Sequence, residues 1–347
     1  MKGFSAVGLF AGKISMAFSL LAPPLFADFG HHYPCTPKEK HMHEIVLSKL
    51  NQRTVPKLAV NEELGESSHA KKTRGELAFG PEHKSRISFM FYQTKELPPQ
   101  GKAPILFLFS GMSGINILDK YLAHFFVDKG YSVVLSHYFD LEENQSIQKV
   151  NESMREGVYA NLALVDYFTS LPNIDGDKVG MLGMSFGGIR AVHQTVLDKR
   201  IKASVLMVTG APLAEIMAKS ELPVMEELRN LHMKKAGLST VDQYFKAIEK
   251  QLTFTIADWS CRRSPDDFSM YISTSDKMVP SMTQWQLHEQ LGSPQMRKSS
   301  LGHVNWPVWA SLWHKKDMLR FFNKQVLGVH SEESSPTPSP IPAMGFN

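Results

Sequence analysis

Long runs of one charge and long apolar stretches are both missing from this 347-residue chain. Its formal net charge is only +4, and its 38 lysines and arginines form no dense basic run of the kind that grips nucleic-acid phosphates. No apolar stretch reaches the roughly 20 residues that a membrane-spanning helix needs. Hydrophobic residues make up 43% of the chain, enough for one large core or two modest ones. We therefore expect a globular protein with no nucleic-acid partner and no stable membrane span after processing.

Acidic residues are absent from residues 1–27, which place Lys2 and Lys13 ahead of an apolar stretch from Ile14 to Phe26. The order of basic, then apolar, then small residues predicts a signal peptide that is cut after Ala27. An uncleaved membrane anchor is the alternative. The prediction of a cleaved signal implies a periplasmic or secreted protein.

Cysteine is scarce, with only Cys35 and Cys261 in the chain. In an oxidising compartment the two can pair, but sequence leaves a bridge and two independent thiols equally open. Four histidines surround Cys35, namely His31, His32, His41 and His43. Imidazole and thiolate are ligands of zinc and copper, yet this spacing matches no closed metal site. We interpret the region as a polar, mobile N-terminus, and we expect no metal and no cofactor.

The remaining chain alternates strand-like and helix-like segments, which predicts an α/β protein with a mostly parallel sheet covered by helices on both faces. A helix-rich stretch at about 212–262 interrupts the alternation before the strand at 267–276. We expect it to form a cap, with plain crossover helices as the alternative. The expected organisation is an N-terminal extension with first strands (28–84), a catalytic domain (85–325) that contains the cap, and a disordered Ser- and Pro-rich tail (326–347).

A glycine-bounded serine stands between a predicted strand and a predicted helix, in the order Gly183-Met184-Ser185-Phe186-Gly187. This is the G-x-S-x-G pattern in the context that makes it meaningful. The turn is so sharp that side chains two residues either side of the serine would collide with neighbouring backbone. The pattern predicts a nucleophile, Ser185, presented at the carboxyl edge of the sheet.

A nucleophilic serine needs a base and an acid, and both follow in the expected chain order. Asp276 comes just after a predicted strand, so it lies at the same edge of the sheet as Ser185. His303 follows one more short strand. Glu215, after the preceding strand, is the alternative acid.

These segments resemble the α/β-hydrolase superfamily, and within it the dienelactone-hydrolase-like and prolyl-oligopeptidase-like serine esterases. The resemblance runs from about residue 85 to 325 and rests on "VDYFTSLPNIDGDKVGMLGMSFGG", "SDKMVP" and "GHVNW". It implies the α/β-hydrolase fold, a catalytic triad of Ser185, Asp276 and His303, and ester or amide substrates. Dienelactone hydrolases themselves generally carry cysteine at the position of Ser185.

The chemistry expected of these residues is nucleophilic catalysis through an acyl-enzyme. His303 takes the proton of Ser185 during attack, and Asp276 orients the imidazole. The backbone N–H groups of Phe186 and Met112 are the expected oxyanion donors.

We expect His137 and Trp306 to contact the substrate, a small ester with an apolar or aromatic group. The leading interpretation is a serine carboxylic-ester hydrolase. A peptidase or amide hydrolase of the same fold is the first alternative. A non-catalytic binding protein and an acyltransferase on this scaffold also remain open.

Overall fold

The computed structural model describes residues 35–51, 53–138, 146–252 and 255–329. The predicted signal peptide, His31, His32 and nearly all of the predicted tail lie outside these residues. Within them, no helix is both long and apolar enough to cross a membrane.

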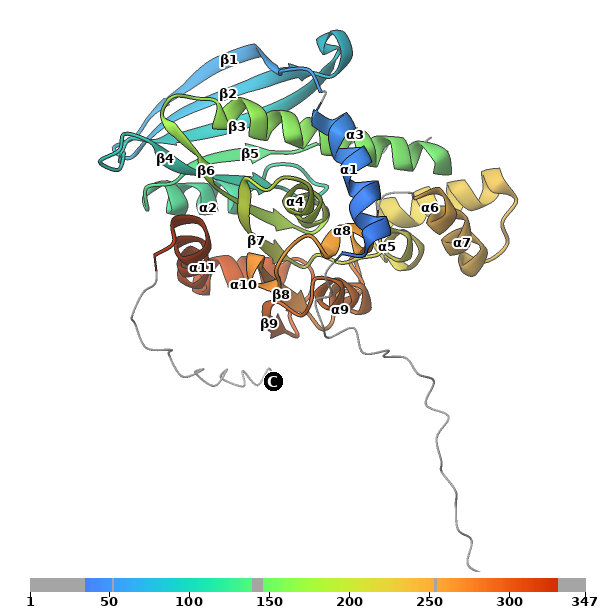
Figure 1. The fold of residues 1–347 in the computed structure, drawn as a ribbon. Helices are drawn as coiled ribbons and strands as arrows, with labels where there is room; N and C mark the ends of the chain where they lie inside the picture. The colour runs from blue at the N-terminus through green and yellow to red at the C-terminus, as the bar shows by residue number, and fades with distance from the viewer. Residues whose placement is uncertain (1–34, 52, 139–145, 253–254, 330–347) are drawn as a thin grey trace, which may run out of the picture.

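The described strands form one nine-stranded sheet in the order β1-β2-β3-β5-β4-β6-β7-β8-β9 (Figure 1). The first three pairs in this order, β1–β2, β2–β3 and β3–β5, are antiparallel. The remaining pairs, from β5–β4 to β8–β9, are parallel. The bounds are β1 (Lys57–Glu66), β2 (Ala70–Phe79), β3 (Ser85–Thr94), β4 (Ala103–Phe109), β5 (Ser132–Ser136), β6 (Ile174–Met184), β7 (Ile201–Met207), β8 (Phe268–Ser273) and β9 (Gln295–Ser299). The prediction of a mostly parallel sheet is confirmed.

Helices cover both faces of the sheet, as the strand-helix alternation predicted. Side chains of α3 and α4 share one core cluster, and those of α2, α10 and α11 share the cluster on the other face. The bounds are α1 (Pro37–Asn51), α2 (Ile117–Val127), α3 (Ile147–Thr169), α4 (Phe186–Leu197), α5 (Leu213–Lys219), α6 (Pro223–Ala236), α7 (Val241–Gln251), α8 (Ala257–Ser260), α9 (Ser281–Gln290), α10 (Asn305–Trp313) and α11 (Lys315–Leu327), with short 3₁₀ turns η1 (Pro81–His83) and η2 (Pro265–Asp267).

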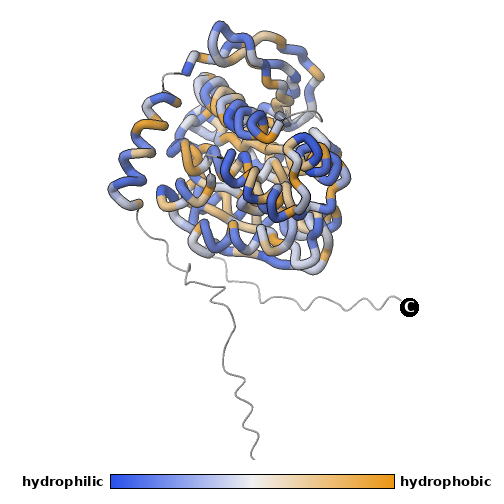
Figure 2. The backbone as a smooth tube through the Cα atoms, turned by 90° about the vertical axis from the view of Figure 1, so that its right-hand side faces the viewer, coloured by the Kyte–Doolittle hydropathy of each residue, from blue (hydrophilic) through white to orange (hydrophobic). Residues whose placement is uncertain are grey.

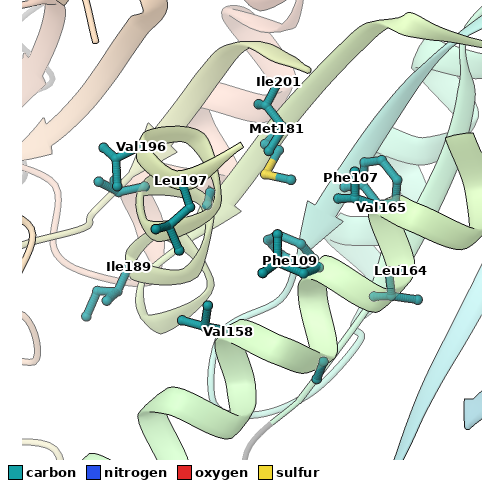
Figure 3. Close-up of a cluster of buried hydrophobic side chains, with 14 of the residues drawn as sticks. Phe107, Phe109, Val158, Leu164, Val165, Met181, Ile189, Val196, Leu197 and Ile201 are labelled. Carbon is teal, nitrogen blue, oxygen red and sulfur yellow. The ribbon is translucent and has the colours of Figure 1, made fainter. Parts of the chain in front are cut away.

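The central strands are apolar on both sides because both sides are covered. Every residue of β4 is buried, and Figure 3 shows its Phe107 and Phe109 together with Met181 of β6 and Val165 of α3. By contrast, every residue of the antiparallel edge strand β1 is exposed. The parallel half of the sheet therefore contains the rigid core on which a site can be built.

The predicted cap is helical, and it consists of α5 to α8 between β7 and β8. Its first three helices share a small apolar core of their own with Val150 at the start of α3. Figure 1 shows α6 and α7 at the side of the molecule, next to the N-terminal end of α3. The insertion thus packs against the body of the domain through α3.

The expectation of a mobile N-terminus is wrong for residues 37–51, which form helix α1. A disulfide between Cys35 and Cys261 ties the start of this helix to the end of α8. His43 is buried and stacks on Trp259, with ring centroids 4.2 Å apart. Figure 2 shows α1 as a mostly hydrophilic helix at the margin of a body whose apolar segments lie inside. Sequence periodicity missed α1 because most of its side chains are exposed, and it is held by a disulfide, a ring stack and a short apolar contact through Val46, Leu47 and Leu50.

Candidate active site

Ser185 occupies the turn between β6, which ends at Met184, and α4, which begins at Phe186. Its backbone has φ 55° and ψ −123°, a region that non-glycine residues rarely adopt and that is typical of strained functional sites. The Ser185 N–H donates to the Met207 carbonyl at 2.8 Å, and the Ser185 carbonyl accepts from the Gly188 N–H at 3.0 Å. These bonds hold the strained turn in place at the carboxyl end of the parallel strands.

The two glycines of the motif are required by crowding, as the sequence predicted. A Cβ at Gly183 would lie 2.5 Å from the Gly187 carbonyl oxygen, and a Cβ at Gly187 would lie 2.0 Å from the Phe109 carbonyl oxygen. Both distances are far below van der Waals contact with backbone atoms. The structure therefore confirms the steric explanation of the motif.

Asp276 and His303 meet at the same edge of the sheet. Asp276 follows β8 and His303 follows β9, and these two strands are parallel neighbours. His303 Nδ1 lies 2.6 Å from Asp276 Oδ2, and the Asp276 side chain has no exposed surface. The hydroxyls of Ser273 and Ser275 donate to the carbonyls of Leu301 and Ser300, both at 2.5 Å. The loops that present the acid and the histidine are thus joined to each other.

The Asp276 carboxylate is saturated with hydrogen bonds. Its Oδ1 accepts from the backbone N–H groups of Met278 and Val279, at 2.9 and 3.0 Å. Its Oδ2 accepts from Gln284 Nε2 at 2.9 Å in addition to the bond with His303. Gln284 also accepts from the Ser273 N–H at 2.9 Å. Sequence analysis missed Gln284, because no motif marks a glutamine that folds back from α9.

The loop after β4 adjoins Ser185. A Cβ built on Gly111 would lie 3.6 Å from the Ser185 Cβ, and the neighbouring Met112 is half-buried against two apolar clusters. His137, just beyond β5, donates a hydrogen bond to the Gly111 backbone. Burial, helped by the nearby charge of Arg190, lowers the pKa of His137 below its usual value. The surroundings of His137 thus favour its neutral form, and its ring contacts the loop that we expected to supply an oxyanion donor.

The structure gives Trp306 and Glu215 surroundings other than those of a substrate-contacting residue and a catalytic acid. Trp306 is only 3% exposed and packs against Tyr271 and His314, so its ring lies in the core beside β8 and not on an open pocket wall. The alternative acid Glu215 pairs with Lys219 at 2.6 Å on α5. The partner that the structure gives to His303 is Asp276.

One group of potential metal ligands occurs in the described part of the chain. Cys35, Cys261 and His43 place one ligand atom each within 4.8 Å of one another. Both cysteine sulfurs are bonded to each other, and His43 Nε2 lies 2.7 Å from the Asp258 carbonyl oxygen. Because a disulfide is not a thiolate ligand, this cluster is structural in the oxidised protein.

Comparison with known families places the chain among hydrolases. The model of the dienelactone hydrolase family matches residues 92–225, and the model described as BAAT / acyl-CoA thioester hydrolase C terminal matches residues 163–307. A sequence comparison with curated proteins finds no match.

Solved structures of esterases have a similar fold. Acetyl xylan esterase 1 from a Thermoanaerobacterium species superimposes with a TM-score of 0.60 at 18% identity, over 83% of this chain and 96% of that one. An acetyl xylan esterase from a Paenibacillus species gives 0.66 at 14% identity, over 86% and 98%. The acylaminoacyl peptidase of Pyrococcus horikoshii gives 0.54 at 12% identity, over 80% of this chain and 51% of that one. With this sheet, this serine turn and these matches, the chain has the α/β-hydrolase fold and is similar to the dienelactone hydrolase family over residues 92–225.

Proposed function

We propose that this protein is a serine hydrolase that cleaves carboxylic esters through an acyl-enzyme on Ser185. The observation that carries the proposal is the 2.6 Å bond between His303 and the fully buried Asp276. These two residues are distant in sequence from the serine turn, yet they follow parallel strands of the same sheet and emerge at the same edge. A base oriented by a buried acid, at the edge where a strained serine is presented, is the arrangement of a serine hydrolase.

In the proposed reaction, the hydroxyl of Ser185 attacks the acyl carbon while His303 Nε2 accepts its proton. The bond from Nδ1 to Asp276 fixes the tautomer in which Nε2 is free to accept. The N–H groups of Phe186 and Met112 stabilise the oxyanion, each contributing on the order of 3 kcal/mol to the transition state. His303 then protonates the leaving alkoxide, and a water molecule, activated by the same histidine, releases the acid.

Ester substrates are favoured over amides by the solved structures with a similar fold. Two of them, covered almost completely, are named as acetyl xylan esterases. The named peptidase is about twice as long as the region shared with this chain. A panel of p-nitrophenyl esters of increasing acyl length, set against aminoacyl anilides, separates the two activities. Faster turnover of the anilides would replace the proposal with the peptidase alternative.

The nucleophile is tested by Ser185→Ala. We expect at least a 10³-fold loss of ester turnover, because no other group forms the acyl-enzyme. The fold should persist, since a methyl group fits where the hydroxymethyl group was. The exposed Ser239 on the cap provides a control, and Ser239→Ala should keep full activity. Retention of more than a few per cent of turnover by correctly folded Ser185→Ala would refute the assignment.

We also propose that the protein is exported and that the mature chain begins at or near Asp28. The acid-free, basic-then-apolar start supports this, and a disulfide between the two cysteines suits an oxidising compartment. Intact-mass analysis of protein from the expression host, alkylated without reductant, tests both points. A mass that includes residues 1–27 contradicts cleavage, and uptake of two alkyl groups contradicts the bridge.

A further inference from the structure

Arg190 is a buried cation that the proposed mechanism does not use. It lies on α4, little more than one helical turn after Ser185, and only 6% of its surface is exposed. Among the described residues, no carboxylate forms an ion pair with it. Burial lowers its pKa to about 9, so it remains charged at neutral pH. A buried guanidinium loses its hydration and must be stabilised by its surroundings.

Two aromatic rings surround the guanidinium of Arg190. Its Cζ lies 5.0 Å from the ring centroid of Phe186 and 5.3 Å from that of Tyr138. Both distances are within the range of a cation–π interaction, which is stronger in a desolvated site. Arg190 thereby connects the first residue of α4 to the segment that follows β5.

Each of these rings lies in a segment that contains or contacts one of the two proposed oxyanion donors. Phe186 supplies one of the proposed N–H groups through its own backbone. Tyr138 follows His137, which donates to the Gly111 backbone next to Met112, the second proposed donor. A continuous set of contacts thus runs from Phe186 through Arg190 and Tyr138 to the loop after β4. The two proposed donors come from segments more than 70 positions apart, and their spacing must be fixed by such contacts.

We infer that Arg190, which lies over the rings of both Phe186 and Tyr138, is a positioning residue that sets the spacing between the two halves of the oxyanion hole. The inference rests on the proposed function. Hydrogen bonds to an oxyanion lose strength steeply when a donor moves out of line. Loosening the ring contacts of Arg190 therefore weakens transition-state binding more than ground-state binding, and the effect is expected in kcat.

The test compares Arg190→Met and Arg190→Lys with wild type on a p-nitrophenyl ester. Methionine keeps much of the side-chain length but has no charge, and we expect kcat to fall about 10- to 100-fold while KM changes less than about threefold. Lysine keeps the charge without the flat guanidinium, so it should recover part of the loss. The inhibition constant of an aryl boronic acid, which mimics the tetrahedral intermediate, should rise in parallel with the fall in kcat.

Arg262 provides a matched control. Its guanidinium also lies over an aromatic ring, 5.5 Å from that of Trp259, and donates to the Val196 carbonyl at the far end of α4. Arg262→Met should lower the free energy of unfolding but leave kcat and boronate inhibition unchanged. A merely structural role for Arg190 would give the same result in both variants.

A double variant locates the contact through which Arg190 acts. If Arg190 acts through the ring of Tyr138, adding Tyr138→Leu to Arg190→Met should cost little more than either change alone. The inference is overturned if folded Arg190→Met keeps kcat within twofold of wild type, or if its KM rises at constant kcat. Failure of the proposed function itself would show separately, as an active Ser185→Ala protein.

Discussion

The serine turn and the acid loop reach the same edge of the sheet, but different physics fixes each of them. At the serine turn, atoms are so close that only glycine fits at positions 183 and 187, and the φ of Ser185 lies in the left-handed region. At the acid loop no backbone is strained in this way, and four hydrogen bonds fix the carboxylate of Asp276. Close packing and two backbone hydrogen bonds position Ser185, the proposed nucleophile, whereas side-chain hydrogen bonds position Asp276 and His303.

We expect the largest loss of kcat from a change at Asp276, whose carboxylate accepts the four hydrogen bonds. In Asp276→Asn, the amide oxygen should stay on the two backbone N–H groups, which turns the NH₂ group toward His303 and Gln284. His303 Nδ1 then faces a donor and must give up its proton, so the imidazole adopts the wrong tautomer. We expect kcat to fall roughly 10⁴-fold with the fold preserved.

Glu215→Gln is the matched control for this change, since Glu215 was the alternative acid and its partner is Lys219. It should leave kcat near the wild-type value. A severe loss in Glu215→Gln together with a mild loss in Asp276→Asn would transfer the acid role to Glu215. Steady-state kinetics on one p-nitrophenyl ester decides between them.

Gly187→Ala tests whether close packing fixes the serine turn. The added methyl group would lie 2.0 Å from the Phe109 carbonyl oxygen, so either the turn or the end of β4 must move. We expect the free energy of unfolding to fall by about 3 kcal/mol or more, with loss of activity. Gly302→Ala, where the added methyl group meets nothing within 4 Å, should change stability by less than about 0.5 kcal/mol. Urea unfolding of both variants measures the difference, and equal midpoints would contradict the steric account.

The same contrast explains what could be predicted from the sequence. The serine turn was predictable because the steric requirement for glycine is local. It shows in the sequence as a strand, two glycines and a helix within a dozen residues. Asp276 and His303 were predictable from chain order and from their places after parallel strands. Gln284 and the ring contacts of Arg190 were not, since they depend on how side chains from separate elements meet in space. The pairing of Cys35 with Cys261 was undecidable for the same reason, because 226 positions separate them.

We expect the smallest effect from Gln284→Leu. This variant tests whether the four hydrogen bonds to Asp276 orient its carboxylate together. The change removes one of four bonds to Asp276 and leaves the Ser273 N–H without its acceptor. A hydrogen bond to a charged group is worth about 1.5 to 3 kcal/mol, but three bonds remain to hold the carboxylate. We therefore expect kcat to fall about tenfold and the free energy of unfolding to fall by about 2 kcal/mol.

Gln286, on the same helix α9, provides the control for Gln284, because its buried Oε1 makes no hydrogen bond within the described part of the chain. Gln286→Leu should leave kcat unchanged and should not lower stability. If Gln284→Leu were as inactive as Asp276→Asn, the carboxylate would depend on this one amide and not on four bonds together. If instead it kept full turnover, the two backbone N–H groups alone would suffice to orient Asp276, and α9 would serve the site only by packing.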